Sequence, residues 1–132
     1  MNSLSDKLPP QNIDAEKSLL GALLTDREAI NRVVDMIQGD HFYQRSNQLI
    51  WNAITELWEK HENIDLLSVR TRLSDTSNLD AAGGVVYLTS LASDVPTAAH
   101  IQTYARIIQR KKSLRDLLNV SHQLQSLAHR ED

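Results

Sequence analysis

The sequence predicts an all-α fold: a small globular helical head followed by one long helix. Aromatic residues make up only 5% of the 132 residues, so the core has to be built from aliphatic side chains, which suits packed helices. Four Gly and three Pro leave few breaks in the chain. Apolar residues recur at helical spacing in several segments, whereas no alternating run typical of a strand appears.

Residues 1–10 are expected to form a flexible N-terminal arm, because two consecutive prolines at its end favour extended backbone. Asn12 can cap the helix that follows. Asp14 and Glu16 fall in its first turn, where the helix dipole stabilises carboxylates, so we interpret both as structural rather than as an acid–base pair. The apolar residues of this helix share one side: Leu19, Leu20, Leu23 and Leu24.

Thr25 and Glu28 have the spacing of a capping box and predict a second helix that ends near Gly39. Its apolar residues are Ala29, Ile30, Val33, Val34 and Ile37. A third helix over residues 46–61 has the strongest apolar pattern in the chain. That pattern consists of Leu49, Ile50, Ala53, Ile54, Leu57 and Trp58.

Two shorter helices complete the predicted head, which spans residues 11–96. Asp65 can cap the first of them, which ends near Ser74. Gly83 and Gly84 permit a tight turn into the second. The apolar residues of this last short helix are Tyr87, Leu88 and Leu91.

The last expected helix lies in residues 97–132, with Thr97 as its cap, and its apolar stripe changes sides halfway along. At about 100° per residue, one face holds Ile101, Tyr104, Ala105 and Ile108. The other face, about 180° away, holds Leu114, Leu117, Ser121, Leu124 and Ala128. The first face can pack on the chain's own core, whereas the second needs a partner from another molecule. The alternative is that the end of the helix folds back onto its own domain.

Composition excludes several functions. A net charge of −3 gives no general electrostatic signature of nucleic-acid binding, and the absence of cysteine excludes disulfides and thiolate metal sites. The adjacent glycines lack the Lys and Ser or Thr of a phosphate-binding loop, and the histidines lack the spacing of a helical metal site. We therefore expect no catalytic, cofactor-binding or metal-binding residue in this chain. Without an apolar span or a signal peptide, a cytoplasmic location with no membrane contact is expected.

A belt of basic residues lies where the stripe of the last helix changes sides. It consists of Arg106, Arg110, Lys111, Lys112 and Arg115. The belt could contact a phosphate, an acidic partner or nucleic acid, or it could be a solvated collar that separates the two apolar faces. No aromatic residues interleave with it for base stacking, which favours the collar.

Four motifs, in this order and at these separations, resemble the N-terminal domain of DnaB-type bacterial replicative DNA helicases. They are Leu8-Pro-Pro-Gln-Asn-Ile-Asp-Ala-Glu-Lys-Ser-Leu-Leu-Gly-Ala-Leu-Leu24, Asp40-His-Phe-Tyr43, Ala82-Gly-Gly-Val-Val-Tyr-Leu88 and Val95-Pro-Thr-Ala-Ala-His-Ile101. Each motif alone is weak, but the set covers nearly the whole chain. The resemblance implies that the last helix is the first arm of a helical hairpin. It also implies that the chain is a piece of a larger enzyme whose ATPase domain, absent here, binds ATP and Mg²⁺.

The resemblance also implies partners. Members of the family form hexameric rings that unwind DNA at the replication fork using ATP, and their N-terminal domains form a collar arranged as a trimer of dimers. The collar binds primase and, in some lineages, a helicase loader, while DNA is contacted through the whole hexamer rather than through this domain.

Site residues follow from this resemblance. The interface with another subunit or with primase is expected at Leu114, Leu117, Leu118, Leu124 and Leu127. Asp14 and Tyr87 match positions near the family's primase-docking surface, although Tyr87 could equally belong to the core. The alternative identity is the helicase-binding domain of bacterial primase, which has a similar head and hairpin. The position of the N-terminal arm directly after Met1 favours the helicase.

Overall fold

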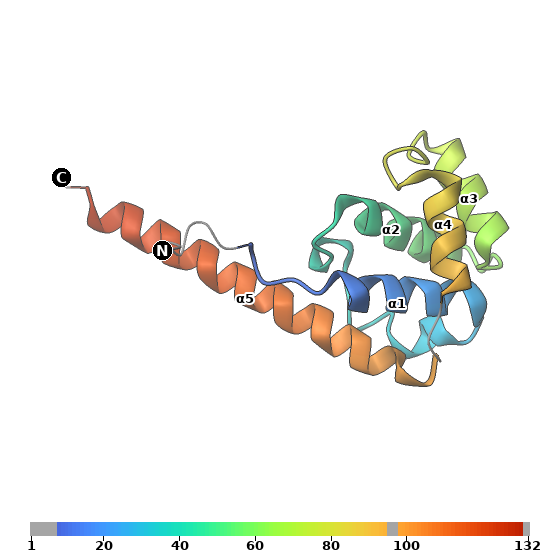
Figure 1. Ribbon diagram of the computed structural model, residues 1–132, viewed down its shortest axis with the longest axis horizontal. Helices are drawn as coiled ribbons and strands as arrows, with labels where there is room; N and C mark the ends of the chain where they lie inside the picture. Colours follow the sequence, from blue (N-terminus) through green and yellow to red (C-terminus); the bar gives the residue numbers. More distant parts are fainter. Residues whose placement is uncertain (1–7, 95–97, 131–132) are drawn as a thin grey trace.

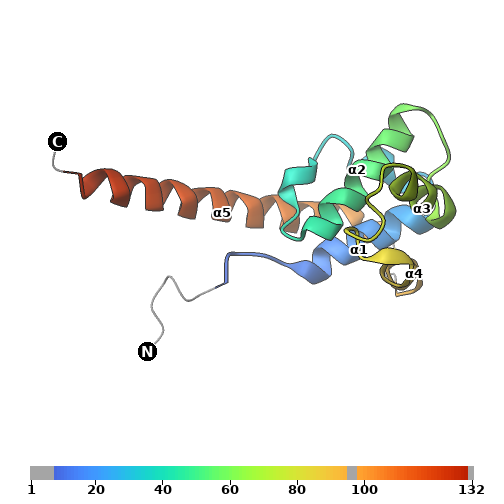
Figure 2. The ribbon, with the colours of Figure 1, turned by 90° about the horizontal axis from the view of Figure 1, so that it is seen from above.

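A long helix projects from one side of a bundle of shorter helices (Figure 1). The computed structural model describes residues 8–94 and 98–130, and within these residues every regular element is helical. Seen from above, the same helix extends away from the head and does not fold back onto it (Figure 2). The structure confirms the predicted all-α class, with a helical head followed by one long helix.

Five α-helices form this architecture within the described residues, with α1 at its centre. Their bounds are α1 Ile13–Thr25, α2 Arg45–Glu59, α3 Leu66–Asp75, α4 Gly84–Ser93 and α5 Ile101–Ala128. Three short 3₁₀ helices connect them: η2 Ala29–Arg32, η3 Gly39–His41 and η4 Ala98–His100. Helix α1 contacts α2, α4 and α5, while α3 packs between α2 and α4.

The predicted starts of α1 and α3 are confirmed by their caps. The side-chain oxygen of Asn12 accepts a hydrogen bond from the Ala15 N–H at 2.9 Å. The Asp65 carboxylate accepts from the Ser68 N–H at 2.8 Å, and the Ser68 hydroxyl oxygen accepts from the Asp65 N–H at 2.9 Å. Each side chain therefore satisfies backbone donors that have no partner inside the helix.

The turn into α4 needs both of its glycines in the left-handed region. Gly83 has a φ of +102° and Gly84 a φ of +76°. At Gly83 a Cβ atom would lie 2.6 Å from the Tyr87 ring, whereas at Gly84 it would meet nothing within 4 Å. Gly83 is thus required for both conformation and space.

The predicted second helix is wrong. Thr25 ends α1 instead of capping a new helix, because its hydroxyl donates back to the Gly21 carbonyl oxygen at 3.1 Å. The residues that follow form η2 and a series of turns, in which the Asp26 carboxylate accepts from the Glu28 N–H at 3.0 Å. The apolar residues of this segment still reach the core: Ala29, Ile30, Val33 and Ile37 are buried and Val34 is half-buried.

The apolar pattern of α2 is confirmed except at its tryptophans. Trp58 is 37% exposed and its indole N–H donates to the Asn31 side-chain oxygen at 3.3 Å. Trp51, which was not assigned to the stripe, is buried and lies with its ring centroid 5.7 Å from that of Phe42. Helical spacing alone could not distinguish the two, because the loop before α2 supplies the ring that covers Trp51.

The head end of α5 packs as predicted. Ile101, Ala105 and Ile108 are buried against the core, and Tyr104 is partly buried. The expected cap, Thr97, lies outside the described residues, as do residues 1–7 of the expected flexible arm. The apolar surface supplied by the chain's own head therefore covers only the first turns of α5.

Candidate protein-interaction surfaces

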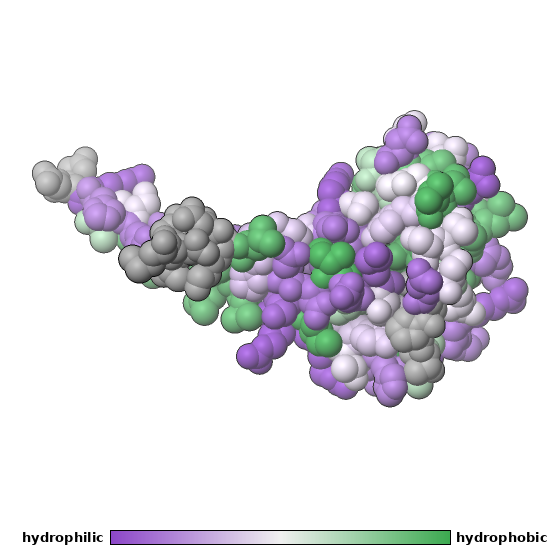
Figure 3. Space-filling view, viewed as in Figure 1, coloured by the Kyte–Doolittle hydropathy of each residue, from purple (hydrophilic) through white to green (hydrophobic). Residues whose placement is uncertain are grey.

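The projecting part of α5 carries a face of exposed leucines. Leu117 is 64% exposed and Leu124 is 61% exposed, while Leu118 and Leu127 are also exposed. Leu114, nearer the head, is partly covered. Figure 3 shows hydrophobic surface on this arm, interrupted by hydrophilic side chains. Four of the five residues predicted for an interface are thus open to solvent.

Val120 belongs to the same face but was not predicted. It is exposed, and at about 100° per residue it lies between Leu124 and Leu127 in helical projection. The stripe predicted from helical spacing is narrower and does not include Val120. We call the exposed set the leucine face: Leu117, Leu118, Val120, Leu124 and Leu127.

A second surface lies between α1 and α4, where the predicted residue Asp14 is found. Asp14 is exposed and lines a pocket of about 210 Å³. The pocket is lined by Asp14, Lys17, Ser18, Ser90, Leu91 and Asp94. The ammonium group of Lys17 also lies 6.0 Å from the centroid of the Tyr87 ring, within reach of a cation–π interaction. Asp14 and Tyr87 are therefore on the same side of the head.

Glu16 is only 2% exposed, and its carboxylate lies at the start of another helix. It accepts hydrogen bonds from the Tyr43 N–H at 2.7 Å and the Gln44 N–H at 3.4 Å, both at the start of α2. It also accepts from the Asn47 side-chain amide at 2.9 Å. Glu16 lies in the first turn of α1 and is structural, as predicted, but its hydrogen-bond partners are at the start of α2. Its partners are 27 to 31 residues away in sequence, so spacing could not reveal them.

Tyr87 is half-buried and joined to the Glu16 carboxylate through one residue. Its hydroxyl donates to the side-chain oxygen of the fully buried Asn47 at 2.5 Å, and the amide of Asn47 donates to Glu16. Burial raises the pKa of Tyr87 above its ordinary value, against the opposing effect of hydrogen bonds from Ser46 and Asn47. The hydroxyl is therefore structural, while the residue as a whole remains partly exposed.

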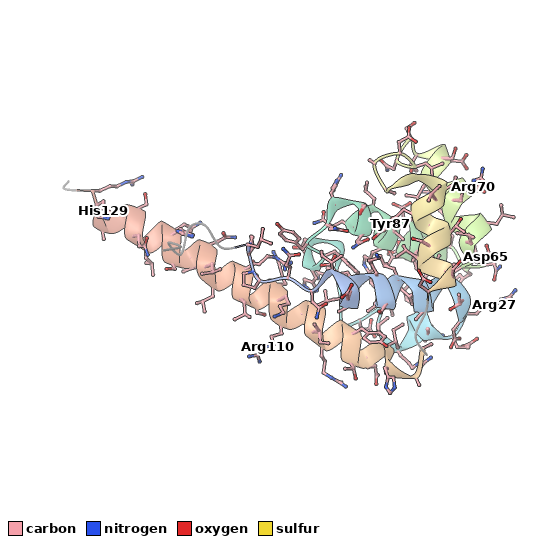
Figure 4. The ribbon with its side chains drawn as sticks, in the orientation of Figure 1. Arg27, Asp65, Arg70, Tyr87, Arg110 and His129 are labelled. Carbon is pink, nitrogen blue, oxygen red and sulfur yellow. The ribbon has the colours of Figure 1, made fainter. Side chains whose placement is uncertain are left out.

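The basic belt is not a uniform solvated collar. Arg115 donates to two backbone carbonyls of the head, those of Pro10 and His41, each at 2.8 Å. Lys112 pairs with Asp116 at 3.0 Å along the same helix. Arg106 and Arg110 are exposed, and Figure 4 shows Arg110 pointing away from the head. The collar interpretation is wrong for Arg115, which is part of the head's packing.

Metal-ligating clusters and membrane-spanning helices are both absent from the part of the chain that the structure describes. Within residues 8–94 and 98–130, no group of three or more His, Cys, Asp or Glu side chains is placed to hold a metal ion. None of the helices in these residues combines the length and apolar character needed to cross a membrane.

Comparison with known families identifies the domain. The sequence model described as DnaB-like helicase N terminal domain matches residues 8–110, which is more than half of the chain. The chain belongs to this family. The DnaB-like domain includes the whole helical head and the packed first part of α5.

Individual relatives agree with this DnaB-like assignment. The replicative DNA helicase DnaC of Bacillus subtilis is 42% identical over 118 residues, and DnaB of Geobacillus stearothermophilus is 37% identical over 117 residues. Each of these alignments covers 89% of this chain but only 26% of the relative. The chain thus spans about a quarter of the length of these curated relatives.

Solved structures support the same fold. The crystal structure of the N-terminal domain of DnaB helicase from Mycobacterium tuberculosis matches with a TM-score of 0.89 at 34% identity, covering 92% of this chain and 87% of that one. A structure of a DnaB-like replicative helicase and its interactions with primase matches with a TM-score of 0.76 at 24% identity, covering 87% and 26%. The second likeness shows the fold alone. These matches are to helicases and do not favour the alternative identity as a primase domain.

Proposed function

We propose that this DnaB-like domain is the N-terminal collar of a replicative DNA helicase, where it pairs subunits within a hexamer and docks primase. The observation that carries the proposal is the leucine face, which lies exposed on the arm of α5. In this proposal, unwinding of duplex DNA with ATP and Mg²⁺, and contact with DNA, belong to the rest of the parent protein. A role in bacterial replication also implies a cytoplasmic location, and the proposed partners include a helicase loader.

A second copy of this chain is the occupant we propose for the leucine face. Large apolar side chains gain about 1.5–3 kcal/mol each when they are fully buried, so several of them on one helix provide a strong driving force for association. A face on a straight projecting helix can meet the same face of another copy about a two-fold axis. Pairing of two arms buries the leucine face without any change in the head.

The test replaces leucines in the face by charged residues. Leu117→Asp combined with Leu124→Asp is expected to weaken self-association at least tenfold in sedimentation equilibrium, with the helical content unchanged. The matched control, Asn119→Asp combined with Ser126→Asp, adds the same charges at the same spacing on the side of the helix opposite Leu117 and Leu124. Equal weakening by both pairs, or loss of the fold in the leucine variant, would contradict the proposal.

Primase docking is proposed for the α1/α4 side of the head, which holds Asp14 and Tyr87. Support comes from the exposed carboxylate of Asp14 at a pocket, on the same side of the head as the partly exposed Tyr87. One homologous fold also comes from a helicase described with its interactions with primase.

The docking site is tested by reversing one charge. Asp14→Lys is expected to reduce the affinity for the helicase-binding domain of the primase by about tenfold in calorimetry, because it places a like charge beside Lys17. Asp35→Lys makes the same change at an exposed carboxylate outside the pocket and should leave the affinity unchanged. An unchanged affinity in Asp14→Lys would contradict primase docking at the α1/α4 side of the head.

A further inference from the structure

Helix α5 leaves the head at Arg115. Ile108 is its last buried apolar residue, and the side-chain amide of the next residue, Gln109, donates to the Met36 carbonyl oxygen at 2.6 Å. Among the described residues, no α5 side chain beyond Arg115 has a hydrogen bond to the head. The remaining residues of α5, 116–128, extend for about 20 Å at 1.5 Å per residue.

Arg115 joins three segments of the chain at this point of departure. Its two terminal nitrogens donate to the carbonyl of Pro10, which precedes α1, and to that of His41, which precedes α2. Its guanidinium carbon lies 5.5 Å from the centroid of the Tyr43 ring. A planar guanidinium presents its donors in a fixed fork, so two carbonyls and a ring restrain the direction of the side chain in several ways.

The aromatic ring beside Arg115 is itself held from the other side. The backbone N–H of Tyr43 donates to the buried Glu16 carboxylate, and the neighbouring Phe42 carbonyl accepts from the Gln48 side chain at 2.7 Å. The segment that Arg115 contacts is therefore held in place by hydrogen bonds to both α1 and α2. Because this segment is rigid, its contacts with Arg115 can fix the orientation of α5 relative to the head.

We infer that Arg115 is a positioning residue that sets the angle at which α5 projects from the head. The buried apolar residues of α5 end at Ile108 and the Gln109 bond follows directly, so without Arg115 the helix is held mainly over its first turns. Over the about 30 Å from there to the end of the helix, a rotation of about 20° displaces the tip by about 10 Å. The angle therefore fixes where the leucine face meets a second copy, and this last step rests on the proposed function.

Double electron–electron resonance measures the distance between two spin labels in one molecule, and this distance reports the angle between α5 and the head. The chain has no cysteine, so Glu59→Cys on α2 and Gln123→Cys on α5 label it at two defined, exposed positions. Dilution with unlabelled protein removes distances between molecules. With Arg115 present we expect one narrow distance distribution; with Arg115→Gln we expect it to shift or broaden by at least 5 Å, because both carbonyl bonds are lost. A distribution identical to that of the parent would overturn the inference.

Two further variants separate positioning from general damage. Arg110→Gln removes the same charge from an exposed side chain that points away from the head, and should change nothing (Figure 4). Arg115→Lys keeps the charge but loses the planar fork of donors, so it should still broaden the distance distribution. If Arg115→Gln does not fold, Arg115→Lys provides the test instead. Distances restored to normal by lysine would contradict a role for the fork.

Self-association of the same variants distinguishes this inference from the proposed function. Arg115→Gln is expected to weaken self-association at least fivefold while circular dichroism and thermal unfolding show a folded head. A changed distance in a chain that never associates would refute pairing but support Arg115 as the positioning residue. Normal pairing with an unchanged distance would refute the inference about Arg115 and leave pairing intact.

Discussion

At the scale of single residues, a buried carboxylate joins three helices of the head. Glu16 on α1 accepts hydrogen bonds from the start of α2, and through Asn47 it is connected to Tyr87 on α4. Removing water from a carboxylate is costly unless donors replace the water, and here three donors do so. Glu16 therefore fixes the relative positions of helices that carry the proposed docking residues.

Substitution of Glu16 by glutamine should destabilise the domain. The amide keeps the shape of the side chain but loses its charge, and its NH₂ group then faces other hydrogen-bond donors. We therefore expect the free energy of unfolding to fall by about 2–3 kcal/mol. Asp14→Asn makes the same change at an exposed residue of the same turn and should cost less than about 1 kcal/mol. Urea denaturation measures both, and equal losses would contradict the assigned role.

Tyr87 gives the head a pH dependence at alkaline pH. Burial raises the pKa of the Tyr87 hydroxyl in the folded state above its value of about 10 in the unfolded chain. The contribution of Tyr87 to the free energy of unfolding is therefore complete below the pKa of the unfolded chain, and it is lost as the pH rises through the pKa of the folded state. The free energy of unfolding of the parent should therefore exceed that of Tyr87→Phe by less at about pH 11 than at about pH 8. Urea denaturation at the two pH values tests this, and a constant difference would count against it.

At the scale of elements, most helices could be predicted from local patterns, but their connections could not. The caps Asn12 and Asp65 and the glycine pair before α4 act within a few residues, so the sequence displays them directly. The segment after α1 was misassigned because the hydroxyl of Thr25 bonds backward along its own helix.

The parts of the candidate site that escaped prediction depend on distant residues. Arg115 bonds to carbonyls 74 and 105 residues away, and any residue type can supply a carbonyl. Periodicity identified the leucines of α5 because they lie on one helix, and their exposure confirms that the chain's own head does not cover them. Side-chain contacts between elements require the fold itself.

The start of α4 offers a prediction about a single turn. Gly83→Ala introduces both a left-handed alanine and a contact with the Tyr87 ring, so a loss above about 2 kcal/mol is expected. At Gly84 the same substitution meets open space and should cost only the conformational penalty of about 1 kcal/mol. Thermal unfolding compares the two variants, and a larger loss at Gly84 would contradict the geometry described for this turn.

At the scale of the whole molecule, the domain has one packed end and one unpacked end. The core lies in the head and includes only the first turns of α5, while the leucine face extends beyond it (Figures 1 and 3). An isolated helical segment of about four turns is only marginally stable in water. Because it continues a packed helix, the arm is expected to stay helical on average but to open locally and often until another molecule covers it, which links the protection of its amides to assembly.

The concentration dependence of amide hydrogen exchange tests pairing through α5 most directly. In dilute solution, the amides of residues 116–128 should exchange rapidly, and at high concentration they should become protected at least tenfold while those of α1 and α2 remain unchanged. The head thus serves as an internal control within each sample. Exchange in the arm that does not change with concentration, or protection that appears in the head instead, would contradict the account.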